Sequence, residues 1–316
     1  MYSCIHLNYT YYLNFLPTKF NLLDTNLYLR YNVCRKCIHC IPYIFITFFE
    51  FWGVVVVMDL NKLCGMSGKT AIITGAASGI GAGIARFFSD NGIRVIIADI
   101  NEDLARTVEK EINDAGNEAH FMKCNVTKEA DCKALADAVA EKYGRIDILV
   151  NCAGVARRHT VETLPESDWD LAINVTLKSV FLMSKHVVPH MKKAGGGKIV
   201  NIGSGWALKG GDHAVSYCAA KGGVWNMTRA MAIDHGPDNI NINCVCPGDI
   251  DTPMLKSECE QLGGVYDEKY KADCAQRPMA RLGAPVDVAM CVFFLCSDMA
   301  PWVTGSSLVV DGGGIA

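Results

Sequence analysis

The chain has 316 residues, a formal net charge of −3 and a hydrophobic content of 50%. This length and hydrophobic content suffice for a sizeable core. The slightly acidic balance excludes the overall basic character of a protein that binds nucleic acid or anionic lipid. The 15 cysteines are scattered along the chain and cannot all pair, so we expect reduced thiols and a cytoplasmic protein.

The first 57 residues differ in composition from the rest, being rich in Tyr, Phe, Leu and Asn and poor in charge. The run 41–57 resembles a membrane anchor, but it contains Pro42 and Glu50 and is shorter than the ~20 apolar residues that a span needs. We expect that the native protein begins at Met58 or Met66. A genuine anchor and an ordinary extension are the alternatives.

Cys34, Cys37 and Cys40 have the spacing of a metal-site fragment. They lack a convincing fourth ligand, and we therefore expect no metal.

The body of the chain, residues 66–316, alternates short β-rich runs with longer helical patterns, which is typical of stacked βαβ units. We predict one domain of the α/β class, a doubly wound parallel sheet with ligands beyond the carboxyl ends of its strands. The seven predicted strands are Thr70–Thr74, Arg94–Ala98, Ala119–Lys123, Ile146–Val150, Lys198–Ile202, Asn241–Val245 and Ser307–Val310.

A glycine-rich turn follows the first predicted strand and runs directly into a helical pattern. Its glycines allow a tight turn and let a pyrophosphate approach the backbone amides at the helix N-terminus. The turn therefore predicts a dinucleotide site formed by Thr74, Gly75, Ser78, Gly79, Ile80 and Gly81.

Asp99 stands at the end of the second predicted strand, 18 residues after Gly81. A carboxylate at this place can accept hydrogen bonds from both hydroxyls of the adenosine ribose and repels a 2′-phosphate. No Arg or Lys lies in the glycine turn or directly after Asp99. We therefore expect NAD in preference to NADP. The alternative role for Asp99 is as the N-cap of the helix that begins near Glu102.

Small and amide residues after the next two strands suit a nucleotide that lies across the sheet edge, although each is also a common turn residue. They are Asn125, Val126, Asn151, Ala153 and Gly154.

Tyr217 and Lys221 lie four residues apart in a helical pattern, which puts a phenol and an ammonium on one face. A cation about 4 Å from the phenol is worth roughly 4 kcal/mol at an effective dielectric constant of ~20. That is on the order of three pKa units, so we expect the pKa of Tyr217 to fall from ~10 towards neutrality. Such a phenol serves as a general acid or base.

Two further polar residues belong with Tyr217. Ser204 follows the fifth predicted strand and lies 13 residues before Tyr217, where its hydroxyl can hold a substrate oxygen. Asn174 is an unusual choice for a helix interior, and holding a water for proton relay is one explanation.

Together these motifs resemble the short-chain dehydrogenase/reductase family over residues 69–312. The resemblance implies a Rossmann fold, hydride transfer at a carbonyl or secondary alcohol, and a homo-oligomer, a tetramer or a dimer. It also implies that Tyr217 is the general acid/base, Ser204 orients the substrate, Asn174 holds the relay water and Lys221 binds the nicotinamide ribose. By the same resemblance, the loop with Pro247, Gly248, Ile250 and Thr252 holds the nicotinamide carboxamide.

The chain departs from the family pattern at Cys152 and Asn241, where Asn and Arg are common. Substrate choice is expected to depend on residues 155–163, 206–215 and 249–281, the last as a lid. We interpret Arg157 and Arg158 as solvated rather than substrate-binding, and His213 as a surface residue.

The leading hypothesis is an NAD-dependent oxidoreductase of secondary alcohols, with a small-molecule substrate and neither nucleic-acid nor membrane partners. A 3-oxoacyl-carrier-protein reductase that uses NADPH is the alternative enzyme. A non-catalytic dinucleotide sensor or scaffold is the alternative from another class.

Overall fold

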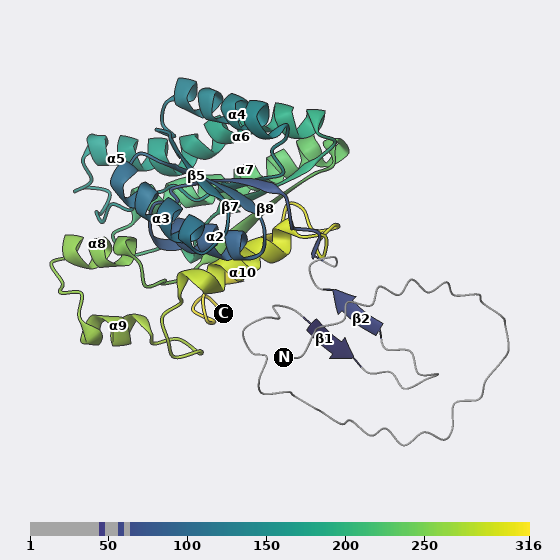
Figure 1. Ribbon diagram of the computed structural model, residues 1–316. Coiled ribbons are helices and arrows are strands. Elements are labelled where there is room, and N and C mark those ends of the chain that lie inside the picture. The colour runs from purple at the N-terminus through teal and green to yellow at the C-terminus, as the bar shows by residue number, and fades with distance from the viewer. Residues whose placement is uncertain (1–43, 48–55, 60–63) are drawn as a thin grey trace, which may run out of the picture. The chain divides into compact units, whose positions relative to one another are not determined.

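The computed structural model describes residues 44–47, 56–59 and 64–316 (Figure 1). Strands β1 (Ile44–Thr47) and β2 (Val56–Asp59) pair in an antiparallel sense. The remainder of the N-terminal segment lies outside the described residues, including Cys34 to Cys40 and the middle of the run 41–57. The hypotheses about that segment stay predictions.

A seven-stranded sheet forms the centre of the body, in the order β5-β4-β3-β6-β7-β8-β9. Each neighbouring pair is parallel. The predicted fold class is confirmed, and the bounds of each predicted strand are right to within two residues. The strands are β3 (Thr70–Thr74), β4 (Arg94–Asp99), β5 (Ala119–Lys123), β6 (Ile148–Asn151), β7 (Gly197–Ile202), β8 (Ile240–Pro247) and β9 (Ser307–Val310).

Helices cover both faces of this sheet because successive strand residues point to opposite sides and both sides are apolar. Ile73 and Val150 belong to one buried cluster, with helices α2 (Gly79–Asp90), α3 (Glu102–Asp114) and α10 (Pro285–Cys296). Ile72 and Leu149 belong to the other, with α4 (Glu129–Tyr143), α6 (Ser179–Lys193) and α7 (Val215–His235).

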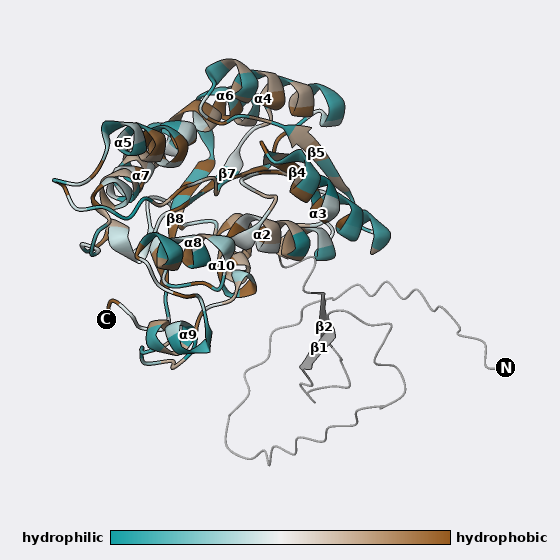
Figure 2. Ribbon diagram, turned by 90° about the vertical axis from the view of Figure 1, so that its left-hand side faces the viewer, coloured by the Kyte–Doolittle hydropathy of each residue, from teal (hydrophilic) through white to brown (hydrophobic). Residues whose placement is uncertain are grey.

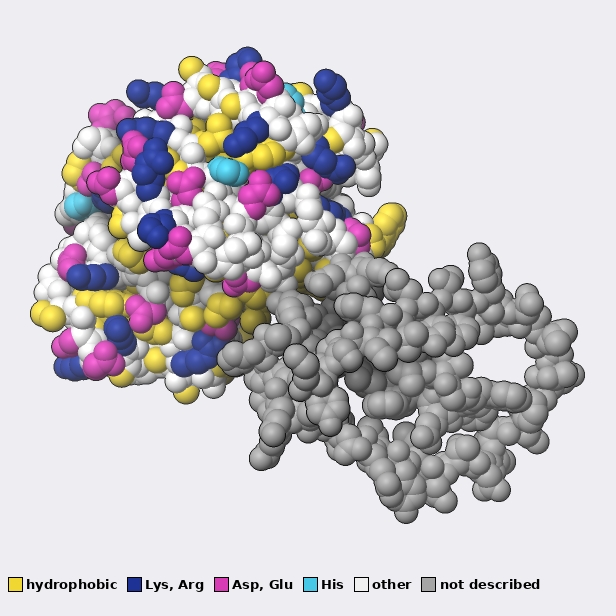
Figure 3. Space-filling view, viewed as in Figure 1, with side chains coloured by type: hydrophobic (Ala, Val, Ile, Leu, Met, Phe, Trp, Pro, Cys, Tyr) yellow, Lys and Arg dark blue, Asp and Glu magenta, His cyan; other side chains and the backbone are white. Residues whose placement is uncertain are grey.

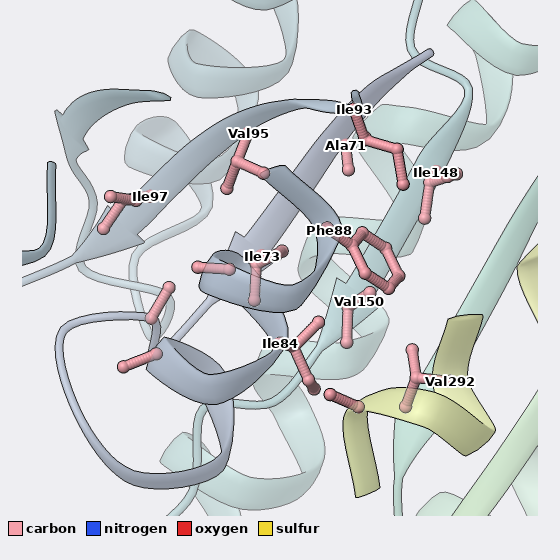
Figure 4. Packing of buried hydrophobic residues seen from close by; sticks show 14 of the residues in the cluster. Ala71, Ile73, Ile84, Phe88, Ile93, Val95, Ile97, Ile148, Val150 and Val292 are labelled. Carbon is pink, nitrogen blue, oxygen red and sulfur yellow. The ribbon is translucent and has the colours of Figure 1, made fainter. Parts of the chain in front are cut away.

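The first cluster centres on Phe88 of α2, which is fully buried against β3, β4 and β6 (Figure 4). Polar residues lie on the outer sides: α3 and α9 (Glu268–Cys274) are largely teal in Figure 2, whereas brown stretches run along β4 and β5. On the face shown in Figure 3, basic and acidic side chains are interspersed. The body thus has the usual division between an apolar interior and a mixed-charge surface.

A long helical stretch, Glu166–Lys193, combines α5 (Glu166–Ile173), the π-helical turn η1 (Asn174–Lys178) and α6. Among the described residues it alone is long and apolar enough to cross a membrane, judged by length and composition. Its apolar side packs against the sheet: Leu182, Met183 and Val187 are buried in the second cluster. Core packing accounts for this apolar character.

The segment after β8 leaves the layered body as an excursion that carries α8 (Pro253–Gln261) and α9 (Figure 1). Its two ends are tied together. Gly283 N donates to Asp249 O at 3.0 Å, and Asp251 N donates to Gly283 O at 2.9 Å. The predicted lid segment is therefore a loop whose two ends are held together by backbone hydrogen bonds.

Candidate active site

A cleft of about 410 Å³ lies at the carboxyl-end edge of the sheet, and the segments after all seven strands contribute to its wall. Parallel strands place these ends together, so residues far apart in the sequence meet. The cleft brings together most of the predicted site residues: Gly75, Ser78, Gly79, Ile80, Gly81, Asp99, Asn125, Val126, Ala153, Gly154, Ser204, Tyr217, Lys221, Pro247, Gly248, Ile250 and Thr252.

The glycine turn has no space for a side chain at two of its glycines, Gly75 and Gly81. A Cβ on Gly81 would lie 2.2 Å from Gly75 O, and one on Gly75 would lie 2.8 Å from Ala153 Cα. Helix α2 begins here with no acidic residue in its first turn, and its N-cap Ser78 makes no side-chain cap hydrogen bond. Free amides and the positive end of the helix dipole therefore face the cleft, an arrangement that fits the pyrophosphate of a dinucleotide.

Two predicted cofactor residues do not line the cleft but support its floor. The Thr74 hydroxyl accepts from Cys152 N at 3.0 Å and from Ala153 N at 3.2 Å, which ties the end of β3 to the end of β6. Asn151 is buried and donates to Asn201 Oδ1 at 2.8 Å. Their places in the structure are those of positioning residues.

The Asp99 carboxylate lines the cleft and is fixed by backbone amides. Its Oδ2 accepts from Ala77 N at 3.0 Å, and its Oδ1 accepts from Asn101 N at 2.9 Å. The alternative interpretation of Asp99 as a helix cap is wrong, because Asn101 is the N-cap of α3 and accepts from Leu104 N. Asp99 thus spans the glycine turn and the end of β4.

Tyr217 and Lys221 lie on one face of α7, as their spacing predicts, and are 8% and 3% exposed. The expected lowering of the Tyr217 pKa is wrong for this structure. Burial raises the pKa of Tyr217, the carboxylate of Glu258 raises it further, and the nearby Ser204 hydroxyl opposes the shift. The reason is positional: Lys221 Nζ donates to Ile202 O at 2.6 Å and lies 5.6 Å from the Tyr217 ring centroid. Burial also lowers the pKa of Lys221.

Ser204 follows β7 and lines the cleft with Tyr217. Its hydroxyl accepts from Trp206 N at 3.1 Å. The Trp206 ring meets the Tyr217 ring edge-on, with centroids 6.0 Å apart. The loop after β7 therefore holds both the Ser204 hydroxyl and an aromatic wall against Tyr217.

Asn174 begins the π turn, and its backbone carbonyl accepts from Ser179 N, five residues later. A π turn of this kind inserts one extra residue into a helix and often marks a functional site. Val175 of this turn lines the cleft, and the hydroxyl of Thr176 bonds to both N and O of Val155. The Asn174 side chain is not among the lining residues, so its relay role stays a prediction.

The most important feature that sequence reasoning missed is an ion pair between Arg158 and Glu258. Arg158 Nη1 lies 2.8 Å from Glu258 Oε2, and the two side chains are only 8% and 11% exposed. The expectation of a solvated Arg158 is wrong because burial requires a partner, supplied here from α8. Arg157 pairs instead with Asp168 and is partly exposed. Arg158 and Glu258 are 100 positions apart in the sequence, and no local sequence pattern predicts that they pair.

The three segments expected to govern substrate choice all reach the cleft. Val155 comes from the first segment, Trp206 and Lys209 from the second, and Met254, Leu255 and Glu258 from the lid.

Two further residues are singled out in the sequence. His213 is a surface residue, as predicted, with its side chain 44% exposed and paired with Asp212. Cys152 lines the cleft, and burial raises the pKa of its thiol to about 12.

Comparison with known proteins places this geometry in a family. Residues 75–314 match the family described as enoyl-(acyl carrier protein) reductase. The chain is 38% identical to the 3-oxoacyl-acyl-carrier-protein reductase FabG of Thermotoga maritima over 249 residues, which are 78% of this chain and 98% of the relative. The chain belongs to the short-chain dehydrogenase/reductase family. It is therefore an NAD(P)-dependent oxidoreductase that acts on CH–OH groups.

Two other similarities show the breadth of this family. The chain is 38% identical to the NAD-dependent glycerol dehydrogenase of Listeria innocua over 253 residues, 80% of this chain and 96% of that one. It also matches the structure of a 7α-hydroxysteroid dehydrogenase complexed with NADH and 7-oxo glycochenodeoxycholic acid. That match has a TM-score of 0.75 and 39% identity, and covers 82% of this chain and 98% of the other. Relatives of similar identity thus act on quite different alcohols.

Replacing Gly81 by Ala tests the glycine cradle. The added Cβ would overlap Gly75 O, so we expect the affinity for NADH to fall at least about tenfold, a loss of roughly 1.4 kcal/mol. Fluorescence titration with NADH measures the affinity. Gly236→Ala is the control, since a Cβ there meets nothing within 4 Å. Equal affinities in the two variants would contradict the assignment.

Proposed function

We propose that the protein transfers a hydride between NAD(H) and a secondary alcohol or ketone, with Tyr217 as general acid/base. One observation carries the proposal: Tyr217, Ser204 and Lys221 share one cleft with the glycine turn and Asp99. A proton-transfer group and a dinucleotide cradle at a common edge are what this chemistry requires.

In the proposed mechanism, the Tyr217 phenolate takes the proton of the substrate alcohol during oxidation, and the Tyr217 phenol gives a proton to the carbonyl oxygen during ketone reduction. NAD, when bound, supplies the hydride acceptor, and its reduced form supplies the hydride. The raised pKa of Tyr217 keeps the phenol protonated at neutral pH. Alcohol oxidation needs the phenolate, so its rate rises with pH, whereas ketone reduction is favoured at low pH.

The neighbouring residues position the substrate and move the proton. Ser204 holds the substrate oxygen beside Tyr217, since both line the same wall. Lys221, whose Nζ is held by Ile202 O at the cleft, is assigned the binding of the nicotinamide ribose. We assign to Asn174, at the start of the π turn, the support of a proton relay behind Lys221.

We propose NAD as the preferred cofactor on the strength of Asp99, whose carboxylate faces the cleft and repels a 2′-phosphate. The basic residue nearest along the sheet is Lys123, the partner of Asp99 in the β4–β5 register. Its Nζ lies 3.8 Å from Glu102, which reduces its availability to a phosphate. These features favour alcohol oxidation with NAD over a 3-oxoacyl-carrier-protein reductase reaction with NADPH.

Replacing Tyr217 by Phe removes only the hydroxyl. We expect turnover of secondary alcohols to fall by ~10²–10⁴, the usual contribution of a general base, while NADH affinity changes little. Tyr143→Phe is the control, because the Tyr143 hydroxyl is buried without a hydrogen-bond partner among the described residues. Steady-state assays across pH measure both effects. Unchanged turnover of every accepted alcohol in Tyr217→Phe would contradict the role of Tyr217 as general acid/base.

Replacing Asp99 by Asn keeps the shape of the side chain and removes its charge. We expect the ratio of kcat/KM for NAD over NADP to fall at least about tenfold, since 1.36 kcal/mol of lost discrimination corresponds to this factor. Asp103→Asn, on the exposed side of α3, is the control. A wild-type enzyme that prefers NADPH and reduces acetoacetyl thioesters would overturn the cofactor proposal and support the alternative reductase.

We also propose a cytoplasmic homo-oligomer. The cysteines of the described residues are all free thiols, which suits a reducing compartment. Helices α5, α6 and α7 expose Trp169, Phe181 and Ile233, the last to 78%. Exposed apolar side chains on neighbouring helices indicate a surface that a second copy covers.

Replacing Ile233 by Asp places a charge on this surface. We expect sedimentation equilibrium to show a smaller assembly than for the wild type, because burying an unpaired carboxylate opposes association. Leu104→Asp, on α3 and also exposed, is the control and keeps the wild-type mass. A wild-type protein that sediments as a monomer would contradict the proposal.

A further inference from the structure

The lid helix α8 is fastened to the loop after β6 by side chains at its C-terminal end. Besides the ion pair with Glu258, Arg158 donates from its backbone N to Gln261 Oε1 at 3.0 Å, and Gln261 Nε2 donates to Ala156 O at 3.3 Å. Arg158 Nη2 donates to Asp212 O at 2.8 Å. These contacts fix the position of α8, and with it the position of the Glu258 carboxylate.

Glu258 is a residue of the cleft wall and acts on Tyr217. It lines the cleft, and its negative charge contributes to the raised pKa of Tyr217. Its Oε2 accepts from Arg158. Its Oε1 has no hydrogen-bond partner among the described residues and is not fully enclosed. The structure therefore leaves one acceptor oxygen without a hydrogen-bond partner on a side chain that lines the cleft.

The surroundings define what this oxygen can bind. Val155, Trp206, Met254, Leu255 and Ile315 make the neighbouring wall largely apolar. An anionic group finds no free cation beside Glu258, because Arg158 is already paired with that carboxylate. A cationic group meets Arg158 beside the carboxylate and Lys221 in the same cleft. A neutral hydroxyl donor is the group that satisfies the acceptor without adding charge.

We propose that Glu258 accepts a hydrogen bond from a second hydroxyl of the substrate, so that the cleft selects neutral diols or polyols over monohydric alcohols and hydroxy acids. This inference rests on the proposed function. A hydrogen bond to a charged acceptor in a buried place is among the stronger ones. A substrate without the second hydroxyl leaves that acceptor unpaired, which is the basis of strong discrimination.

A matched substrate series with wild-type enzyme tests the proposal without a variant. The probes are cyclohexanol, the 1,2-, 1,3- and 1,4-cyclohexanediols, and the hydroxycyclohexanecarboxylates, each with NAD. We expect kcat/KM for at least one diol to exceed that for cyclohexanol about tenfold or more, in keeping with a charged hydrogen bond. The hydroxy acids are expected below cyclohexanol. A cyclohexanol rate equal to or above every diol overturns the inference, and so does a preference for a hydroxy acid.

Glu258→Gln assigns the preference to this residue. Because Arg158 donates to position 258, the amide oxygen turns towards Arg158 and the amide NH₂ group faces the cleft, where it cannot accept. We expect the diol-to-cyclohexanol ratio to fall several-fold, because the amide can only donate to the second hydroxyl and the charge-assisted hydrogen bond is lost. Glu260→Gln, exposed on the same helix beside Lys256, keeps the wild-type ratio. An unchanged ratio in folded Glu258→Gln that still binds NADH overturns the assignment. Absence of NADH formation from these probes and from a wider panel of secondary alcohols would contradict the proposed function instead.

Discussion

The parallel alignment of seven strands is the constraint on which the rest of the structure depends. Because the carboxyl end of every strand lies at one edge, the glycine turn, Asp99 and the Tyr217 helix meet in one cleft although they span much of the chain. The core maintains this alignment, because two apolar clusters pack against opposite faces of the sheet. Buried bonds such as Cys152 N to Thr74 then set neighbouring strand ends against each other.

Buried charge gives the cleft its chemical character. Lys221 and Glu258 are both largely removed from water, and each is held by a partner: Ile202 O for the ammonium and Arg158 for the carboxylate. Burial and Glu258 together keep Tyr217 a weak acid. The protonation of the phenol therefore depends on the whole set of neighbours, including the lid helix that carries Glu258. With the proposed role of Glu258, substrate choice and proton transfer are coupled through one residue of that helix.

The sequence predicts the fold and the cleft residues because their signals are local: alternating β and helical patterns, glycines in the first turn, and the four-residue spacing of Tyr217 and Lys221. The predictions that are wrong concern residues that are distant in the sequence and come into contact only in the folded protein. Glu258 lies 100 residues from Arg158, so no sequence signal predicts the buried ion pair or the effect of the Glu258 carboxylate on the Tyr217 pKa. Asn101, rather than Asp99, caps α3, because the Asp99 carboxylate is occupied by two amides.

The transfer of deuterium from 4-deuterated NADH to a ketone tests the central claim most directly. If the cleft joins a dinucleotide to the Tyr217 site as described, deuterium from one face of the nicotinamide appears at the carbinol carbon of the alcohol product, and the new hydroxyl proton comes from solvent. Two results would contradict the account. One is an alcohol product that carries no deuterium at the carbinol carbon, whichever face of the nicotinamide was labelled. The other is the absence of product from any ketone although NADH binds.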